Sequence, residues 1–399
     1  MTQPGPPEYG HNPPSTTHTW QQMPPAAPFS GQPASGSPNR GRGPVWFALL
    51  AVLALVAGLL GGLGGAALLR DSSSTSSPVL GGAPGGRMTE QPPAEPGSVQ
   101  EVAARVLPSV VSIAVSVGRQ SGSGSGVVLS ADGTILTNAH VVSAGGTDAA
   151  RDVLVSYSNG KRARARVLGA DPMSDIAVIK AESTGLTPIT VGASDNLTVG
   201  QDVIAIGSPL GLAGTVTTGI ISALNRPVST TGADGSHESV IDAIQTDAAI
   251  NPGNSGGALV NAAGALIGVN SAIATMGSSQ GASGSIGLGF AIPIDQAMRV
   301  AKQIIAGQPV TRANLGVNVR PSPDPMAPGA VVAGLVAGGA AQQARIPEGA
   351  VITAVDDRTI ASSEDLVAAI RSREPGETVK ITYTDQGRAA TATVKLGEA

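Results

Sequence analysis

Residues 245–260 read QTDAAINPGNSGGALV, and this stretch decides how the rest of the sequence is interpreted. Ser255 stands in a turn of asparagine, proline and glycine that leads into the strand-like run ALV. Gly253 permits backbone dihedrals that other residues rarely adopt, and the pair Gly256-Gly257 permits close approach of another backbone. A serine nucleophile needs such a turn, because nearby N–H groups must hold the oxyanion of a tetrahedral intermediate. The candidate oxyanion site comprises Gly253, Asn254 and Ser255, with the N–H groups of Gly253 and Ser255 as donors; the alternative is an ordinary glycine-rich turn.

Two earlier motifs carry the partners that an activated serine requires. In TNAHVV, His140 follows a β-like run, and an apolar setting can hold its imidazole in one tautomer; taken alone, it is more often a structural histidine. In SDIAVIK, Asp175 stands at the mouth of an apolar strand, where a carboxylate can accept the imidazole Nδ1–H. Asp247 is the rival acceptor, but its closeness to Ser255 in the sequence favours a role in bracing the loop.

The region around these motifs is rich in short strand-like runs separated by turn signals such as Asp132-Gly133. Many short strands with few helices indicate an all-β barrel or sandwich. The stretch from Gly118 to Gly126 reads as a short loop, and a helix is expected over 293–306. The expected strands of this region include 109–117, 152–157, 175–180, 202–207 and 265–273.

The composition excludes several classes of site. The chain has no cysteine, which rules out disulfides and cysteine-ligated metal centres. Its net charge of −4 and its few aromatic residues (two Trp, three Tyr, three Phe) argue against a nucleic-acid-binding protein. High alanine and glycine with 19 Arg against 5 Lys is typical of proteins from high-GC actinobacteria.

The N-terminal quarter has a different character from the rest. Residues 1–43 are rich in Pro, Gly and Ser and predict a disordered tail. Residues 45–69 contain no charge, and a helix of their length, roughly 37 Å, exceeds the ~30 Å hydrocarbon core of a membrane. We therefore expect a transmembrane helix over 44–70 and a flexible linker over 71–97, with a capping box at Ser98 starting the ordered part.

The three motifs, in the order His140, Asp175, Ser255, resemble those of trypsin-like serine proteases of the HtrA (DegP/DegS-type) family. The resemblance implies a mainly β fold, a chymotrypsin-like double six-stranded β-barrel over 98–310. It also implies that these three residues form a catalytic triad that cleaves peptides through an acyl-enzyme, without a metal or an organic cofactor. By family position, the first substrate pocket is lined by Ile250, Asn270, Ser271 and Ala272, which favours cleavage after small aliphatic residues.

Residues 311–399 resemble the PDZ domain that follows the protease in this family, with strands near 315–319, 331–336, 350–355, 378–384 and 390–396 and a helix to about Arg371. Asn314-Leu-Gly-Val317 resembles its carboxylate-binding loop, along which a peptide C-terminus would add as a strand. The resemblance implies peptide binding by Leu315, Gly316, Val317, Leu366 and Ile370; the alternative for the apolar ones is plain core packing.

The function implied by the resemblance is a membrane-anchored endoprotease acting on misfolded or tagged extracytoplasmic proteins. The protease and PDZ domains then lie outside the cell membrane, held by one helix. The family also implies a homotrimer, although residues 98–117 lack the aromatic residues that often form that contact. Two alternatives remain: a PDZ-based peptide-binding or chaperone protein with latent proteolysis, and a signalling protease with one membrane substrate.

Overall fold

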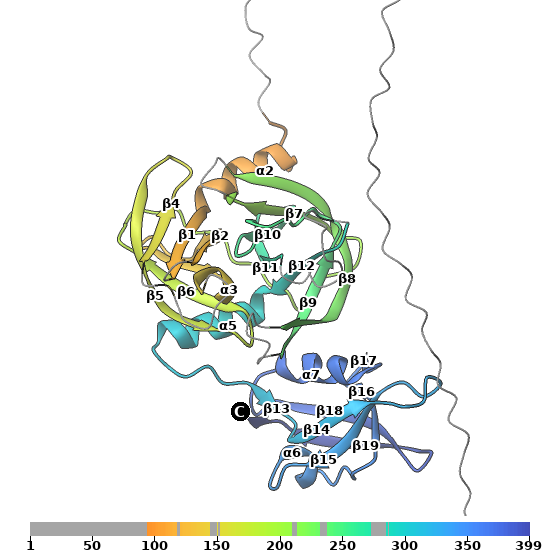
Figure 1. Ribbon diagram of the computed structural model, residues 1–399. Helices are drawn as coiled ribbons and strands as arrows, with labels where there is room; N and C mark the ends of the chain where they lie inside the picture. The colour runs from red at the N-terminus through yellow and green to blue at the C-terminus, as the bar shows by residue number, and fades with distance from the viewer. Residues whose placement is uncertain are drawn as a thin grey trace, which may run out of the picture. The chain divides into compact units, whose positions relative to one another are not determined.

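The computed structural model describes residues 94–117, 120–143, 150, 152–209, 214–231, 238–272, 285 and 287–399 (Figure 1). The predicted tail 1–43, the predicted membrane helix 44–70 and all but the last residues of the linker 71–97 lie outside the described residues. Among the helices that are described, none has both the length and the hydropathy needed to cross a membrane.

The first half of the protease region closes into a six-stranded barrel in the order β1-β2-β3-β6-β5-β4. Its interior is aliphatic, with Val111, Ile113, Ile135 and Ile179 fully buried, because alternate residues of each strand point inward. The strands are β1 (Val110–Val117), β2 (Gln120–Val128), β3 (Thr134–Thr137), β4 (Asp152–Ser156), β5 (Arg162–Asp171) and β6 (Ile176–Ala181).

Strand β2 corrects the expectation of a loop between Gly118 and Gly126. It pairs with β1 from Val127 opposite Val110 to Gln120 opposite Val117. The stretch QSGSGSGVV has little intrinsic strand preference, so backbone pairing and packing override its composition. At Gly126 there is no room for a larger residue, because a Cβ there would lie 2.7 Å from side-chain carbons of Ile113 and Ile135.

A second closed barrel follows in the order β10-β11-β12-β9-β8-β7, so the prediction of a mainly β, double-barrel fold is confirmed. The long antiparallel pair β8–β9 forms one wall (Figure 1). The strands are β7 (Asp202–Gly207), β8 (Thr215–Thr231), β9 (Glu238–Thr246), β10 (Ala258–Asn261), β11 (Leu266–Ser271) and β12 (Gly289–Pro293).

Short helices accompany the two barrels. At the start of α2 (Val99–Val106), the Ser98 side chain accepts the Glu101 N–H, which is one half of the predicted capping box. The Glu101 carboxylate accepts the N–H of Gly97 and not that of Ser98, whose N–H bonds to the Glu95 carbonyl. The helix predicted over 293–306 packs six buried residues, among them Ala297 and Val300, against the strands. The helices are α2 (Val99–Val106), the 3₁₀ turn η1 (Leu107–Ser109), α3 (Ala139–Val142) and α5 (Ile294–Ile305).

The C-terminal part has its own sheet and its own apolar core. The sheet runs β14-β15-β16-β18-β19, with β17 paired to β16, while β13 and β20 form a separate pair. Strand β14 therefore lies at an edge of the sheet. The elements are β13 (Ala313–Asn314), β14 (Val317–Pro321), β15 (Ala330–Leu335), α6 (Ala340–Gln343), β16 (Val351–Val355), β17 (Arg358–Thr359), α7 (Ser363–Arg371), β18 (Thr378–Asp385), β19 (Arg388–Lys395) and β20 (Gly397–Glu398).

One charged turn joins β2 to β3. The Asp132 carboxylate accepts the N–H and hydroxyl of Thr134 and pairs with the Lys180 amine at 2.5 Å. The bond with Lys180, followed by those with Ser130 and Thr134, lowers the pKa of Asp132 below its usual range. Because the folded-state pKa is depressed, the resulting stability is present above the unfolded value of about 4 and is lost as the pH falls below it.

We predict that Asp132→Asn lowers the melting temperature at pH 7 and that this difference from the parent narrows as the pH falls from 4 to 3. The matched control is Asp202→Asn, an exposed residue that has no side-chain hydrogen bond or ion pair in the described structure. Thermal unfolding followed by circular dichroism checks this, and a difference that stays constant or widens toward pH 3 would refute the role of the Asp132 charge.

Candidate active site

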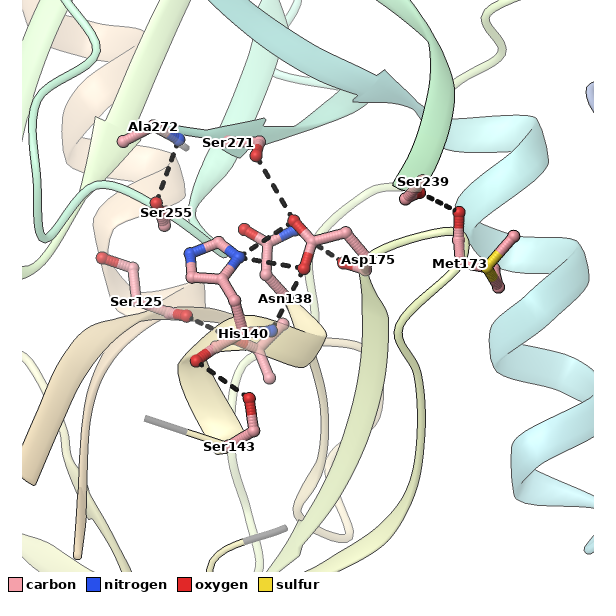
Figure 2. A network of polar contacts seen from close by, with 11 residues as sticks. Ser125, Asn138, His140, Ser143, Met173, Asp175, Ser239, Ser255, Ser271 and Ala272 are labelled. Carbon is pink, nitrogen blue, oxygen red and sulfur yellow. Dashed lines mark hydrogen bonds and ion pairs between the residues drawn. The ribbon is translucent and has the colours of Figure 1, made fainter. Parts of the chain in front are cut away.

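The three residues singled out by the sequence motifs come from both barrels and lie together (Figure 2). His140 lies in α3, directly after β3, and Asp175 lies in the turn between β5 and β6. Ser255 lies in the loop between β9 and β10 of the second barrel. The fold thus brings together residues that are 35 and 80 positions apart in the chain.

The imidazole of His140 is held by the Asp175 carboxylate. Nδ1 lies 2.9 Å from both carboxylate oxygens, and the main-chain N–H of His140 donates to Oδ1 at 3.1 Å. Two bonds from one residue fix both the position and the rotation of the ring. Asp247, the rival acceptor, instead accepts the Ile220 N–H at 2.7 Å, which is the loop-bracing role that the sequence favoured.

The turn that carries Asp175 is itself tightly held. Asp175 has a left-handed backbone with φ of +53°, which few residues other than glycine adopt. Its carbonyl accepts both the Asn138 side-chain amide at 2.9 Å and the Ala139 N–H at 3.2 Å. Ser174 donates its N–H and its hydroxyl to Asp171. The carboxylate is therefore presented from a rigid position.

Sequence reasoning missed these supporting residues. Asn138 belongs to the histidine motif TNAHVV, and it also directly precedes the helix that carries His140 and bonds to the turn that carries Asp175. Its place as the residue before a short helix, where asparagine is favoured, was the available signal. Asp171 lies three residues before Ser174, a spacing common for local side-chain to backbone bonds.

The Ser255 hydroxyl oxygen accepts the N–H of Ala272 at 3.0 Å. In the view of Figure 2, the His140 ring is drawn between Ser255 and Asp175. Among the contacts of the described residues, no hydrogen bond joins the His140 ring to the Ser255 hydroxyl. The serine is buried, with 4% of its surface exposed, whereas the His140 side chain retains 20%.

The loop before Ser255 has the backbone form that the sequence led us to expect. Gly253 has a φ of +97°, in the region that favours glycine. The Asn254 N–H bonds to the Asn251 carbonyl at 2.9 Å, and the Gly253 carbonyl accepts the Ser125 hydroxyl at 2.7 Å. Within the described part of the chain, the N–H groups of Gly253 and Ser255 have no hydrogen-bond partner.

The four residues predicted to line the substrate pocket are all buried, and two of their side chains bond elsewhere. The Ser271 hydroxyl donates to the second oxygen of Asp175 at 3.3 Å. The Asn270 amide donates to the carbonyls of Ile206 and Ala258, inside the second barrel. Ile250 and Ala272 are the apolar members of the set, with 0% and 3% of their surface exposed.

The predicted peptide-binding residues of the C-terminal part are mostly buried in its core, and Gly316 lies beside a cavity. Leu315, Leu366 and Ile370 belong to its hydrophobic core, while Val317 is partly buried beside it. Gly316 has a φ of +73°, and its N–H donates to the Asn314 side chain at 2.7 Å. A cavity of about 400 Å³ opens beside Gly316 and is also lined by Gln343, Lys395 and Glu398.

Comparisons with known proteins agree with this architecture. A trypsin-like peptidase domain matches residues 124–269, and a PDZ domain matches residues 313–396. The serine protease PepD of Mycobacterium tuberculosis is 56% identical over 312 residues, which cover 76% of this chain and 67% of that protein. Since that organism is actinobacterial, the match supports the indication from composition.

Less similar relatives are also named as HtrA-type or DegP-like serine proteases. The serine protease Do-like HtrA of Lactococcus lactis is 38% identical over 297 residues, covering 70% of this chain and 71% of its own length. A probable periplasmic serine endoprotease, DegP-like, from Halomonas elongata is 41% identical over 283 residues, and the match spans only 56% of its length. The solved structure of the HtrA-type protease AlgW with a decapeptide has a TM-score of 0.54 and 33% identity, covering 76% of this chain and 99% of that one.

The double barrel, the C-terminal PDZ domain and these similarities together place the chain in the HtrA family of trypsin-like serine endoproteases with a PDZ domain.

Proposed function

We propose that this endoprotease cleaves peptide bonds with His140, Asp175 and Ser255 as its catalytic triad. The observation that carries the proposal is the pair of 2.9 Å distances from His140 Nδ1 to the two Asp175 oxygens. An Nδ1–H bound to a carboxylate leaves Nε2 free of a proton, as a general base requires. Ser255, from the opposite barrel, is the nucleophile that this base serves.

The reaction begins when the Ser255 side chain rotates about χ1 from the Ala272 N–H towards His140 Nε2. Catalytic hydrogen bonds are often absent before substrate binds and form only in the complex. His140 then takes the hydroxyl proton as Oγ attacks the peptide carbonyl, and it gives that proton to the departing amine. Water hydrolyses the acyl-enzyme by the same steps in reverse. Asp175 stays ionised and stabilises the imidazolium.

The oxyanion of each tetrahedral intermediate is held by the N–H groups of Gly253 and Ser255. Both groups lack a partner in the described structure, and the Asn254 N–H between them is already bound to Asn251. We propose a first substrate pocket formed by Ile250 and Ala272 with the main chain of Asn270 and Ser271. Its apolar side chains favour small aliphatic residues at the cleavage site.

We predict that Ser255→Ala abolishes cleavage of casein and that Asp175→Asn lowers kcat by about 10⁴-fold, because the asparagine favours the wrong imidazole tautomer. The matched control is Asp247→Asn, which loses a loop brace and should keep kcat within about tenfold of the parent. Casein fragments on a gel and initial rates on a peptide substrate measure both effects. Equal losses for Asp175→Asn and Asp247→Asn would contradict the proposed triad.

We propose that the PDZ domain binds the C-termini of unfolded or tagged substrates along β14. That strand lies at an edge of its sheet, where a peptide can add as a further strand. The cavity beside Gly316 is lined by Lys395, whose charge complements a terminal carboxylate, and by Glu398, which opposes it. In the structure the Gly316 N–H donates to the Asn314 side chain, and this bond must break before the N–H can donate to a peptide carboxylate.

A peptide ending in an aliphatic residue should bind the parent at least about tenfold more tightly as the free acid than as the C-terminal amide. Lys395→Gln should shrink that difference, whereas Lys380→Gln, which changes an exposed lysine of β18, should leave it intact. Fluorescence anisotropy with labelled peptides provides the affinities. Equal affinity of acid and amide for the parent would exclude carboxylate recognition.

The sequence of the N-terminal part supports a proposal for where the enzyme is located. We propose that residues 44–70 anchor it in the cell membrane, with a cytoplasmic tail at 1–43, a linker at 71–97, and the protease (98–310) and PDZ (311–399) domains outside. The uncharged run 45–69 supports this, as does the periplasmic location in the names of DegP-like relatives. Assembly as a homotrimer, which the family implies, stays a prediction.

A further inference from the structure

Ser125 makes a pair of hydrogen bonds that no proposed catalytic role explains. Its residue surface is fully buried, and it lies in β2 of the first barrel. Its hydroxyl donates to the Gly253 carbonyl at 2.7 Å and accepts the Ser208 N–H at 2.7 Å. A carbonyl can only accept and an N–H can only donate, so the direction of both bonds is settled.

The main chain of Ser125 is held as firmly as its side chain. Its N–H donates to the Ser255 carbonyl at 2.7 Å, and its carbonyl accepts the Thr137 hydroxyl at 2.7 Å. The residue is also paired with Ser112 in the β1–β2 ladder. The hydroxyl of Ser125 therefore projects from a fixed point of the first barrel onto two segments of the second, the end of β7 and the loop before Ser255.

The bond to Gly253 fixes one particular peptide group. The carbonyl of the Gly253–Asn254 peptide is held by Ser125, and its N–H is held by the Asn251 carbonyl at 2.9 Å. The two proposed oxyanion donors belong to the peptide groups on either side, since the Gly253 N–H precedes it and the Ser255 N–H follows it. If the middle peptide rotates, the dihedral angles on both sides change and the two donors no longer converge.

Glycine makes this constraint necessary. At a φ of +97°, Gly253 lacks the Cβ that would limit rotation of its flanking peptides. Without the Ser125 hydroxyl, the carbonyl of Gly253 would lose its donor in a partly buried site and would turn towards another donor.

We propose that Ser125 is a positioning residue that locks the Gly253–Asn254 peptide and thereby aims the N–H groups of Gly253 and Ser255 at the substrate oxyanion. This rests on the proposed function of Ser255. Loss of one oxyanion donor lowers kcat by about 10²–10³-fold in serine proteases. Misaimed donors retain part of their effect, so loss of the Ser125 hydroxyl should lower kcat by roughly 10–100-fold and leave KM within about twofold.

The test uses the full chain, purified in detergent, with Ser125→Thr and Ser125→Val as the central pair. Threonine and valine have nearly the same shape, and only threonine keeps a hydroxyl. We expect the valine variant to have a kcat roughly 10–100-fold below that of the threonine variant. A peptide boronate, whose tetrahedral adduct places an oxygen in the oxyanion site, should lose affinity for the valine variant by a similar factor, while a substrate-like peptide should not.

Two further variants separate this proposal from its alternatives. Thr137→Val removes a hydroxyl that is equally buried and bonds to the carbonyl of Ser125, so it loosens the same strand without freeing Gly253. It should lower the melting temperature and keep kcat within about threefold of the parent. Ser255→Ala reports on the proposed function alone, since retained cleavage by that variant would refute the catalytic serine whatever Ser125 does.

Equal kcat values for Ser125→Thr and Ser125→Val would overturn the proposal. A loss of kcat in Ser125→Val that Thr137→Val reproduces would also overturn it. The same holds if Ser125→Val weakens the binding of the boronate and of the substrate-like peptide by the same factor, because either result indicates a general packing role.

Discussion

The bond between the Asp175 carboxylate and His140 Nδ1 is the interaction on which the site depends. It joins the turn between β5 and β6 to the helix after β3. The imidazole ring can face Ser255 only while both of these segments hold their positions. Further hydrogen bonds hold the Asp175 residue in position. The left-handed turn at Asp175 is held through its carbonyl by Asn138 and Ala139, and Ser271 reaches the carboxylate from the second barrel.

A second constraint acts at the same junction. The loop that carries Ser255 belongs to the second barrel, yet the carbonyls of Gly253 and Ser255 both bond to one residue of the first barrel, Ser125. In the proposed mechanism, the first barrel thus supplies the base, its carboxylate and the residue that anchors the oxyanion loop, while the second supplies the nucleophile. This division places the proposed site where the barrels meet, and His140 is the most exposed of its three residues.

Much of this could be predicted from the sequence because the informative segments are local. The apolar run DVIAIG predicted β7 to the residue, the helix expected over 293–306 agrees with α5 within one residue at each end, and the expected helix end near Arg371 agrees with α7. Strand β2 was not expected because glycine has a low strand preference, and pairing with β1 and β3 makes this stretch a strand. The role of Ser125 could not be read from the sequence, because its hydroxyl bonds to Gly253 and Ser208, which lie 128 and 83 positions away. Ser271 was assigned to the substrate pocket, and its bond to Asp175 could not be read from one sequence because it joins residues 96 positions apart.

The central claim is that Ser255 is a nucleophile activated by His140, and active-site labelling tests it most directly. The full chain is treated with an alkyl fluorophosphonate, digested and mapped by mass spectrometry, alongside His140→Ala. The account predicts a single phosphonylated residue, Ser255, and labelling slowed by at least about 10³-fold when His140 is absent. Labelling of another residue, or labelling of Ser255 at an unchanged rate without His140, would contradict it.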